Sequence, residues 1–211
     1  MEKKIECVVV GDIQTNCWLY ALDDARNSAG QRPCAVIDPG DEAALIISHL
    51  KDLNWVPRYI LLTHAHFDHL LALPGLLEAF EKGSFREGSS SGPLPKIGIH
   101  RLDAEYLEKQ ALPAADILFE EGDQSGPFRV LHLPGHSPGS AGFYDEKTDV
   151  LFSGDTLFRG NYGRTDLPGG NFQQLRQSLN RLLSMNGEIV VCPGHGPATT
   201  IKEEAAFGFN Y

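Results

Sequence analysis

The feature that most constrains this chain is a group of histidine and aspartate side chains placed directly behind an apolar segment. Residues 59–62 (YILL) are apolar, and the histidine cluster of residues 64–69 (HAHFDH) follows after one threonine. A short apolar run bounded by polar residues is typical of a buried strand, so the cluster begins at a strand end. Side chains two residues apart leave an extended backbone on the same side, which lets His64 and His66 reach one ion. Asp68 and His69 lie where the chain turns, so they suit a second ion.

The chemistry of the histidine cluster favours a metal site over a polar surface loop. Imidazole nitrogen and carboxylate oxygen together suit zinc, iron or manganese. Given the histidine and aspartate content of this chain, a chance His-x-His-x-Asp-His pattern is expected on the order of once in a thousand such chains. We therefore interpret the cluster as a set of metal ligands.

Three further places combine an apolar strand, a glycine-containing turn and a ligand-type residue. These residues are His136, Asp155 and His195. Each is weak evidence alone, because a polar residue after glycine is usually a loop residue. Together with the histidine cluster they supply enough donors for two ions, and a carboxylate with two oxygens is the natural bridge. The predicted ligands are His64, His66 and His136 for one ion, Asp68, His69 and His195 for the other, and Asp155 between them. Asp68 and Asp155 are also predicted to be catalytic.

Composition narrows the class of protein. The chain has 211 residues, 42% of them apolar, which is enough for one sizeable core, so we predict a single domain over residues 1–211. Asp plus Glu number 28 against 18 for Lys plus Arg, and this acidic balance disfavours a nucleic-acid partner. No export signal or membrane-length apolar run is visible, and the four cysteines form no paired motif, so we expect a cytoplasmic protein without a membrane partner. The oligomeric state is left open.

The spacing of apolar residues predicts strands in two batches, each closed by helices. Residues 83–95 are of low complexity and predict a surface loop. The helix expected at 70–80 is interrupted by Pro74-Gly75. The remaining predicted strands are 5–10, 17–22, 34–37, 59–63, 96–100, 117–119, 128–133, 141–144, 150–153 and 188–191, and the remaining predicted helices are 41–53, 102–110, 171–185 and 199–206. This order suggests an α/β chain with two sheets packed face to face and helices outside.

The set of predicted ligands resembles that of the metallo-β-lactamase superfamily, and the resemblance covers nearly the whole chain. It implies an αββα four-layer sandwich of two mixed β-sheets with helices on both outer faces. Residues 154–160 (GDTLFRG) and 163–170 (GRTDLPGG) resemble the glyoxalase II-like thioesterases, particularly the short bacterial hydroxyacylglutathione hydrolases. Full-length glyoxalase II continues into a helical region that helps to hold glutathione, and this chain ends soon after His195. The resemblance therefore implies a thioesterase without implying glutathione as the carrier.

The implied reaction is hydrolysis of a small-molecule thioester by a metal-activated hydroxide. It implies two divalent metal ions, with zinc favoured and iron or manganese also compatible. A thiol of pKa about 8.5 leaves readily as thiolate, so a thioester needs no strong general acid, and none is obvious in the sequence. Asp38 is a candidate to orient a ligand histidine or to form a turn. Arg164 and Asp166 are expected to pair with each other or with neighbours. We place the three remaining histidines, His49, His100 and His132, outside the site.

The main alternative belongs to a different reaction class. Persulfide dioxygenases resemble this chain too, and they use a single iron held at positions that match His64, His136 and Asp155. Ligand spacing does not separate the two activities, but residues 156–158 and 167–170 favour the hydrolase. A secreted β-lactamase is expected to carry an export signal, and a nuclease a more basic surface. A binding module without catalysis is expected to lack a full ligand set.

Overall fold

The structure is a computed structural model that describes residues 4–22, 26–27, 29–85 and 94–209. Its backbone contacts group into two compact units. Unit 1 consists of residues 1–62, 66–98 and 107–117, and unit 2 of residues 63–65, 99–106 and 118–211. Most of the loop predicted at residues 83–95 lies outside the described residues. The single domain over residues 1–211 remains a prediction.

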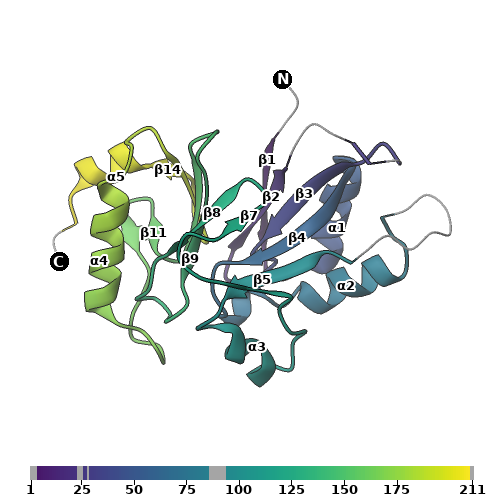
Figure 1. Cartoon of the computed structure of the whole chain (residues 1–211), viewed down its shortest axis with the longest axis horizontal. Coiled ribbons are helices and arrows are strands. Elements are labelled where there is room, and N and C mark those ends of the chain that lie inside the picture. The colour runs from purple at the N-terminus through teal and green to yellow at the C-terminus, as the bar shows by residue number, and fades with distance from the viewer. Residues whose placement is uncertain (1–3, 23–25, 28, 86–93, 210–211) are drawn as a thin grey trace. The chain divides into compact units, whose positions relative to one another are not determined.

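Unit 1 is built on a mixed sheet. The sheet has the order β1-β2-β3-β4-β5-β6, with β1 antiparallel to β2, β2 antiparallel to β3, and β3 parallel to β4. Its strands are β1 (Ile5–Val10), β2 (Thr15–Ala21), β3 (Arg32–Ile37), β4 (Trp55–Leu62), β5 (Lys96–His100) and β6 (Ile117–Phe119), the last two of which run into unit 2. The parallel pair requires a crossover, which α1 (Ala43–Asp52) provides. In Figure 1, α1 lies beside α2 (Leu73–Glu81) along the sheet.

The core of unit 1 follows from the alternation and periodicity of its apolar residues. All seven residues of β2 are buried, as expected for a strand inside a sheet. The helix α1 buries Ile46 and Leu50, four residues apart on one face. The helix α2 buries Leu73, Leu76 and Phe80 in the same manner.

Two predicted elements of unit 1 need correction. The interrupted helix at 70–80 is instead a 3₁₀ turn, η1 (Phe67–His69), followed by α2, which begins at Leu73. Pro74 therefore stands in the first turn, where a missing N–H costs no hydrogen bond. The strand predicted at 59–63 begins earlier, at Trp55, in spite of Pro57. The register of the ladder shifts next to Pro57, and such an irregularity accommodates a proline inside a sheet.

Unit 2 is built on a second mixed sheet of order β14-β13-β10-β9-β8-β7. Only the β10–β13 pair is parallel among the strand pairs described for this sheet. Its strands are β7 (Gln124–Ser125), β8 (Phe128–His132), β9 (Ala141–Asp145), β10 (Val150–Gly154), β13 (Val190–Pro193) and β14 (Thr199–Thr200). A small hairpin joins β11 (Leu157–Phe158) to β12 (Asn161–Tyr162). The helices are α4 (Phe172–Leu183) and α5 (Ile201–Phe207), which pack together (Figure 1), and α3 (Ala104–Lys109) lies where the chain passes from unit 2 to unit 1.

The helix α4 confirms the clearest helix prediction. The side chain of Asn171 accepts a hydrogen bond from the Gln174 N–H, so it caps the helix as expected. Leu175, Leu179 and Leu182 are buried in one cluster with residues of β8, β10 and β13. Phe172 was expected on the same face, but it is 42% exposed because it lies at the first position of the helix, where it contacts the ring of Tyr162.

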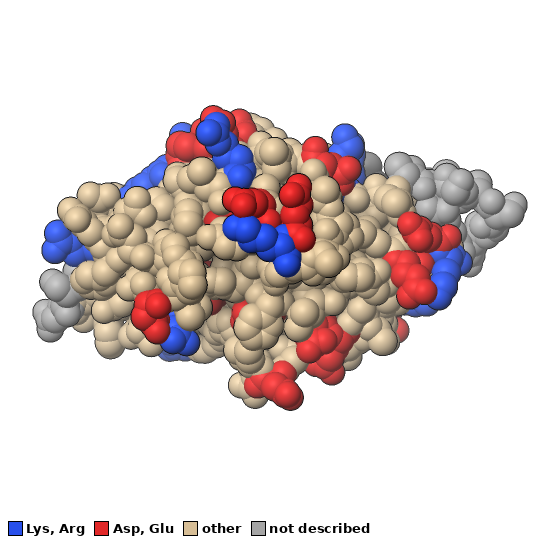
Figure 2. All heavy atoms as spheres, turned by 90° about the horizontal axis from the view of Figure 1, so that it is seen from below, with Lys and Arg blue, Asp and Glu red and all other residues tan. Residues whose placement is uncertain are grey.

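The surface carries charges of both signs. Figure 2 shows one face on which acidic and basic side chains lie intermixed. The ion pairs of the protein include Arg129 with Glu146 and Arg181 with Glu121. None of the helices in the described part of the chain combines the length and apolar character needed to cross a bilayer.

Candidate metal centre

In unit 1, the ring of His69 is held between two carboxylates. Its Nδ1 lies 3.0 Å from Oδ2 of Asp38, and its Nε2 lies 3.5 Å from Oδ2 of Asp68. His69 and Asp38 are buried, and the Thr15 hydroxyl donates to Oδ2 of Asp68 over 3.2 Å. The predicted contact between Asp38 and a histidine of the cluster is therefore present. His66 is half-buried, and its backbone is extended as expected at the start of η1.

The backbone around this group is arranged so that its segments approach closely. Asp38 has a left-handed φ of 51°, which aspartate tolerates better than most residues. A Cβ added to Gly40 would lie 2.1 Å from the carbonyl oxygen of Asp68, so no side chain fits there. The motif Asp38-Pro39-Gly40 thus brings the end of β3 against η1.

In unit 2, one carboxylate oxygen faces two imidazoles. Oδ2 of Asp155 lies 3.6 Å from Nε2 of His136 and 3.5 Å from Nε2 of His195. The ring of His64 meets that of His136 edge to face, with centroids 4.8 Å apart. Unit 2 therefore brings together four predicted ligands that are distant along the chain.

Glycine turns hold Asp155 in place, as the sequence predicted. Gly154 has a positive φ of 51°, and a Cβ there would lie 2.3 Å from the Thr63 hydroxyl oxygen. A Cβ on Gly163 would lie 1.8 Å from the Asp155 carbonyl oxygen and 3.2 Å from Nδ1 of His136. Both positions need glycine because neighbouring backbone and side chains occupy the space of a Cβ.

Three of the predicted ligand histidines share one arrangement. The Nδ1 atom of His64 contacts the Thr63 hydroxyl at 3.0 Å, that of His136 contacts the Arg164 carbonyl at 2.8 Å, and that of His69 contacts Asp38. A carbonyl only accepts, so Nδ1 of His136 is the donor, and its Nε2 faces Asp155. A neutral imidazole that points a lone pair at a carboxylate needs a proton or a cation between them. Anchoring one ring nitrogen while the other faces further donors is typical of metal-bound histidines.

The distances between donors test whether a divalent ion fits. The three Nε2–Oδ2 separations of 3.5, 3.5 and 3.6 Å are longer than ordinary N–H···O hydrogen bonds. Two ligands on a tetrahedral ion, each about 2.1 Å from it, are separated by roughly 3.4 Å. The donor pairs within each unit therefore have the spacing that a shared ion requires, and the residue set fits divalent metal.

A buried carboxylate that sequence reasoning missed supports two of the ligand segments in unit 2. Asp103 accepts the Ala65 N–H at 3.2 Å, the Ser137 hydroxyl at 2.7 Å and the Gly139 N–H at 2.6 Å. Burial raises the pKa of its carboxyl group, and these hydrogen bonds act in the opposite direction. Ala65 follows His64, and Ser137 follows His136, so Asp103 fixes both segments. Its only signal in the sequence is an aspartate three residues beyond a short strand, without a glycine turn.

The predicted pairing of Arg164 with Asp166 is confirmed, whereas the placement of His49, His100 and His132 outside the site stays a prediction. Arg164 and Asp166 pair through two hydrogen bonds of 2.7 and 2.6 Å, and Arg164 holds the pKa of Asp166 at about 2. Nε2 of His132 donates to the Pro138 carbonyl over 2.9 Å, and the His132 ring stacks on that of His100 with centroids 4.0 Å apart. His49 lies on α1, and its Nδ1 is 3.5 Å from Oε1 of Glu6.

None of the four cysteines forms a disulfide bond. Cys17, Cys34 and Cys192 are buried, whereas Cys7 is half-buried. Burial raises the pKa of Cys7 to about 11 and raises those of Cys17 and Cys34 as well, so none of these three is a reactive thiolate near neutral pH.

Two mixed β-sheets with helices, and anchored imidazoles beside carboxylates, define a metal-binding α/β protein. Residues 10–195 match the family model of the metallo-beta-lactamase superfamily, and the chain belongs to this superfamily of metal-binding hydrolases. The predicted fold class, two mixed sheets with helices, is thereby confirmed.

Three relatives illustrate the similarity. The chain is 36% identical over 209 residues to hydroxyacylglutathione hydrolase GloC of Haemophilus influenzae, which covers 95% of this chain and 94% of that protein. It is 38% identical to TTHA1623, solved in a di-iron-bound form, with a TM-score of 0.74 over 95% of this chain and 96% of the other. It is 34% identical to the BLEG-1 B3 metallo-β-lactamase, with a TM-score of 0.79 over 96% of each chain.

Proposed function

We propose that this protein hydrolyses thioesters of small molecules in the manner of glyoxalase II, with two divalent ions, zinc being favoured. The residues that would hold the ions are the seven predicted ligands His64, His66, Asp68, His69, His136, Asp155 and His195. The observation that carries the proposal is Oδ2 of Asp155, which lies 3.6 Å from Nε2 of His136 and 3.5 Å from Nε2 of His195. An oxygen placed between two imidazoles of different predicted ion sites suits a bridging ligand.

Similarity to GloC, together with residues 154–160 and 163–170, supports a thioester over other hydrolase substrates.

The protein residues have separate tasks in this reaction. When bound, the divalent ions supply Lewis acidity, which lowers the pKa of water and polarises a carbonyl group. Asp38, Thr63 and the Arg164 carbonyl fix the ring orientations of His69, His64 and His136. The Asp68 side chain is 16% exposed and is oriented by the Thr15 hydroxyl, so it can accept a hydrogen bond from the attacking water. The leaving thiolate needs no protonation before it departs, so the lack of a strong acid is tolerated.

A second candidate function is persulfide oxidation with a single iron. It is favoured by one observation, that His64, His136 and Asp155 all lie in unit 2 and neighbour one another. The motifs at residues 154–160 and 163–170 support the hydrolase instead.

A substrate panel with metal analysis distinguishes these functions. Protein purified without added metal is analysed for metal content and assayed with S-lactoylglutathione, other thioesters, a lactone, a β-lactam and glutathione persulfide. We expect two ions per chain and thioester hydrolysis. One iron per chain with oxygen-dependent consumption of the persulfide would overturn the hydrolase.

We further propose that the protein works in the cytoplasm without nucleic-acid or membrane partners. The support is the acidic composition, with a formal charge of -10, and the four cysteines, none of which forms a disulfide bond, as is usual in a reducing compartment. A measured association with DNA or with anionic vesicles at physiological salt would contradict this proposal.

A further inference from the structure

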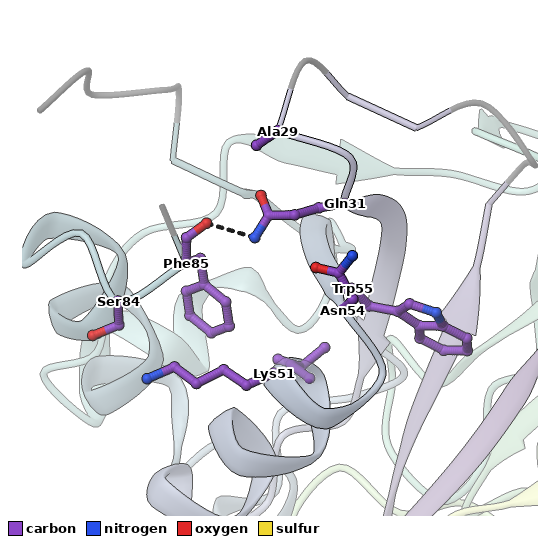
Figure 3. A pocket seen from close by; sticks show the side chains of 8 residues that line it. Ala29, Gln31, Lys51, Asn54, Trp55, Ser84 and Phe85 are labelled. Carbon is purple, nitrogen blue, oxygen red and sulfur yellow. Dashed lines mark hydrogen bonds between the residues drawn. The ribbon is translucent and has the colours of Figure 1, made fainter. Parts of the chain in front are cut away.

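Two pockets in unit 1 differ in what they offer a ligand. The pocket in Figure 3, of about 270 Å³, is lined by Gln31, Lys51 and Asn54 among others, and no predicted metal ligand borders it. Its polar groups already bind the protein, because Gln31 donates across it to the Phe85 carbonyl and Asn54 donates to the Gly30 carbonyl. The other pocket, of about 330 Å³, has Asp68 in its wall. We name it the Asp68 groove.

The Asp68 groove presents apolar side chains to solvent. Ile13 is 52% exposed, Phe67 is 54% exposed and Leu71 is 49% exposed, and all three line the groove. Scattered apolar residues on a surface are ordinary, but three that line one cavity beside a predicted catalytic carboxylate indicate a binding surface.

The walls of the groove are held by hydrogen bonds that backbone N–H groups donate to carbonyl oxygens and to the Glu42 carboxylate. On one side, the turn that follows β1 is closed by Gln14 N–H to the Gly11 carbonyl at 3.1 Å, and Gly11 N–H donates to Glu42 at 2.8 Å. On the other side, the Leu71 N–H donates to the Gly40 carbonyl at 2.9 Å. The groove is therefore formed before a ligand arrives, which lowers the entropic cost of binding.

The charges of the groove select against an anionic occupant. Its lining includes Asp12 and Asp41 in addition to Asp68, and the lining residues include no lysine or arginine. Carboxylates of a thiol carrier such as glutathione would be repelled here, whereas an uncharged apolar group would cover the exposed side chains.

We infer that the Asp68 groove binds the acyl group of the substrate, and that the preferred acyl groups are uncharged and larger than lactoyl. This inference rests on the proposed thioesterase function, because Asp68 then places the scissile carbonyl at the mouth of the groove. A lactoyl group has five non-hydrogen atoms, which occupy no more than roughly 150 Å³ even if each takes the share of about 30 Å³ that a whole water molecule has in the liquid. The groove, of about 330 Å³, has room for several more carbons.

The test is a series of thioesters of increasing acyl length on two carriers. Propionyl, butyryl, pentanoyl and hexanoyl thioesters of N-acetylcysteamine and of glutathione are compared with S-lactoylglutathione, using the metal-loaded protein. Each added methylene should raise kcat/KM about fourfold if the groove buries it completely, and about twofold if the groove buries half of it. We expect this rise with each carbon on both carriers.

Substitutions in the groove separate the acyl group from the carrier. In Ile13→Ser and in Leu71→Ser, kcat/KM should hardly change as acyl carbons are added. The ratio of kcat/KM between the two carriers should stay as in the parent protein. Val9→Ser is the matched control, because Val9 is also 52% exposed and does not line the groove. Metal content is measured for every variant, so that a loss of ions is not mistaken for a loss of acyl binding.

Each outcome decides one question. Hydrolysis that is independent of acyl length, or a rise per carbon that survives both groove variants, overturns the acyl assignment while the thioesterase function stands. A changed carrier dependence in the groove variants, with an unchanged acyl dependence, assigns the groove to the carrier instead. No hydrolysis of any thioester overturns the proposed function and the acyl assignment with it.

Discussion

Replacement of Asp103 by asparagine tests whether a buried carboxylate organises the ligand segments of unit 2. Asparagine has the same shape, but its amide nitrogen must replace either Oδ1 or Oδ2. In place of Oδ1 it would face the Gly139 N–H at 2.6 Å. In place of Oδ2 it would face the Ala65 N–H at 3.2 Å, while the Ser137 hydroxyl can rotate to accept. Either orientation leaves a buried backbone N–H opposite another donor.

The size of the effect follows from these contacts. A buried N–H without an acceptor costs about 1–3 kcal/mol, and the remaining hydrogen bonds lose their charge-assisted strength. Burial raises the pKa of Asp103 because a buried charge is costly. Asparagine carries no charge and avoids this cost, which offsets part of the loss. We expect the free energy of unfolding to fall by about 2 kcal/mol. In a chain of this length, that lowers Tm by about 4–8 °C.

Metal affinity provides the readout that a general loss of stability would not change. Because Asp103 fixes the segments that carry His64 and His136, Asp103→Asn should weaken metal binding by about 10- to 100-fold, measured by competition with a chelator. Asp145→Asn is the control. Asp145 is also buried in unit 2, and it accepts a hydrogen bond from the backbone N–H of Lys147. It pairs with the first residue of β10, whereas Asp155 follows the last residue of that strand. Equal metal affinity in the two variants, or an Asp103→Asn protein as stable as the parent, would refute the reasoning.

Three further predictions concern the bridging carboxylate, the support of His69 and the response to pH. Asp155→Ala should lower thioester turnover by several orders of magnitude with an unchanged circular dichroism spectrum; near-normal turnover would remove Asp155 from the site. Asp38→Asn keeps an acceptor for His69 Nδ1 but removes its charge, so metal affinity should fall about tenfold in a chelator competition, and no change would show that the charge is unimportant. Burial lowers the pKa of His100 from 6.5 to about 4, and the neighbouring His132 contributes a smaller part of this shift. Between pH 6.5 and pH 4 the unfolded chain therefore binds more protons at this residue than the folded chain, so His100 reduces the stability of the fold as the pH falls. When the pH is lowered from 8 to 5, the free energy of unfolding of His100→Gln, measured with urea, should therefore rise relative to that of the parent by on the order of 2 kcal/mol. A difference in free energy that does not change with pH would contradict this prediction.

The parts of the fold that the sequence predicted are those in which local pattern and burial agree. The strands 5–10, 96–100 and 117–119 were predicted with the bounds that the structure shows. The helix α4 has a leucine stripe and an asparagine cap, and both signals are local. The strand β4 was predicted too short, because Pro57 signals a break that only the shifted pairing with β3 accommodates.

The same distinction applies to the candidate metal centre. His64, His136 and Asp155 were predicted because each lies just beyond an apolar strand, which is β4 of the first sheet for His64 and β8 and β10 of the second sheet for the other two. Asp103 could not be predicted in this way, since its role depends on hydrogen bonds to Ser137 and Gly139, 34 and 36 residues away. The stacking of His100 on His132 likewise depends on tertiary contact, although the sequence placed His132 outside the ligand set because it lies within a predicted strand.

The way in which the two units share one chain has a consequence for protein engineering. Unit 1 is left and re-entered at residues 63–65 and again at 99–106. No single cut in the gene therefore yields one intact unit. A recombination breakpoint with a homologue between residues 63 and 117 would combine segments from both parents within the same unit. Grafting a new acyl preference is best done by point changes in the turn after β1 and around η1, which leave every crossing inherited from the same parent.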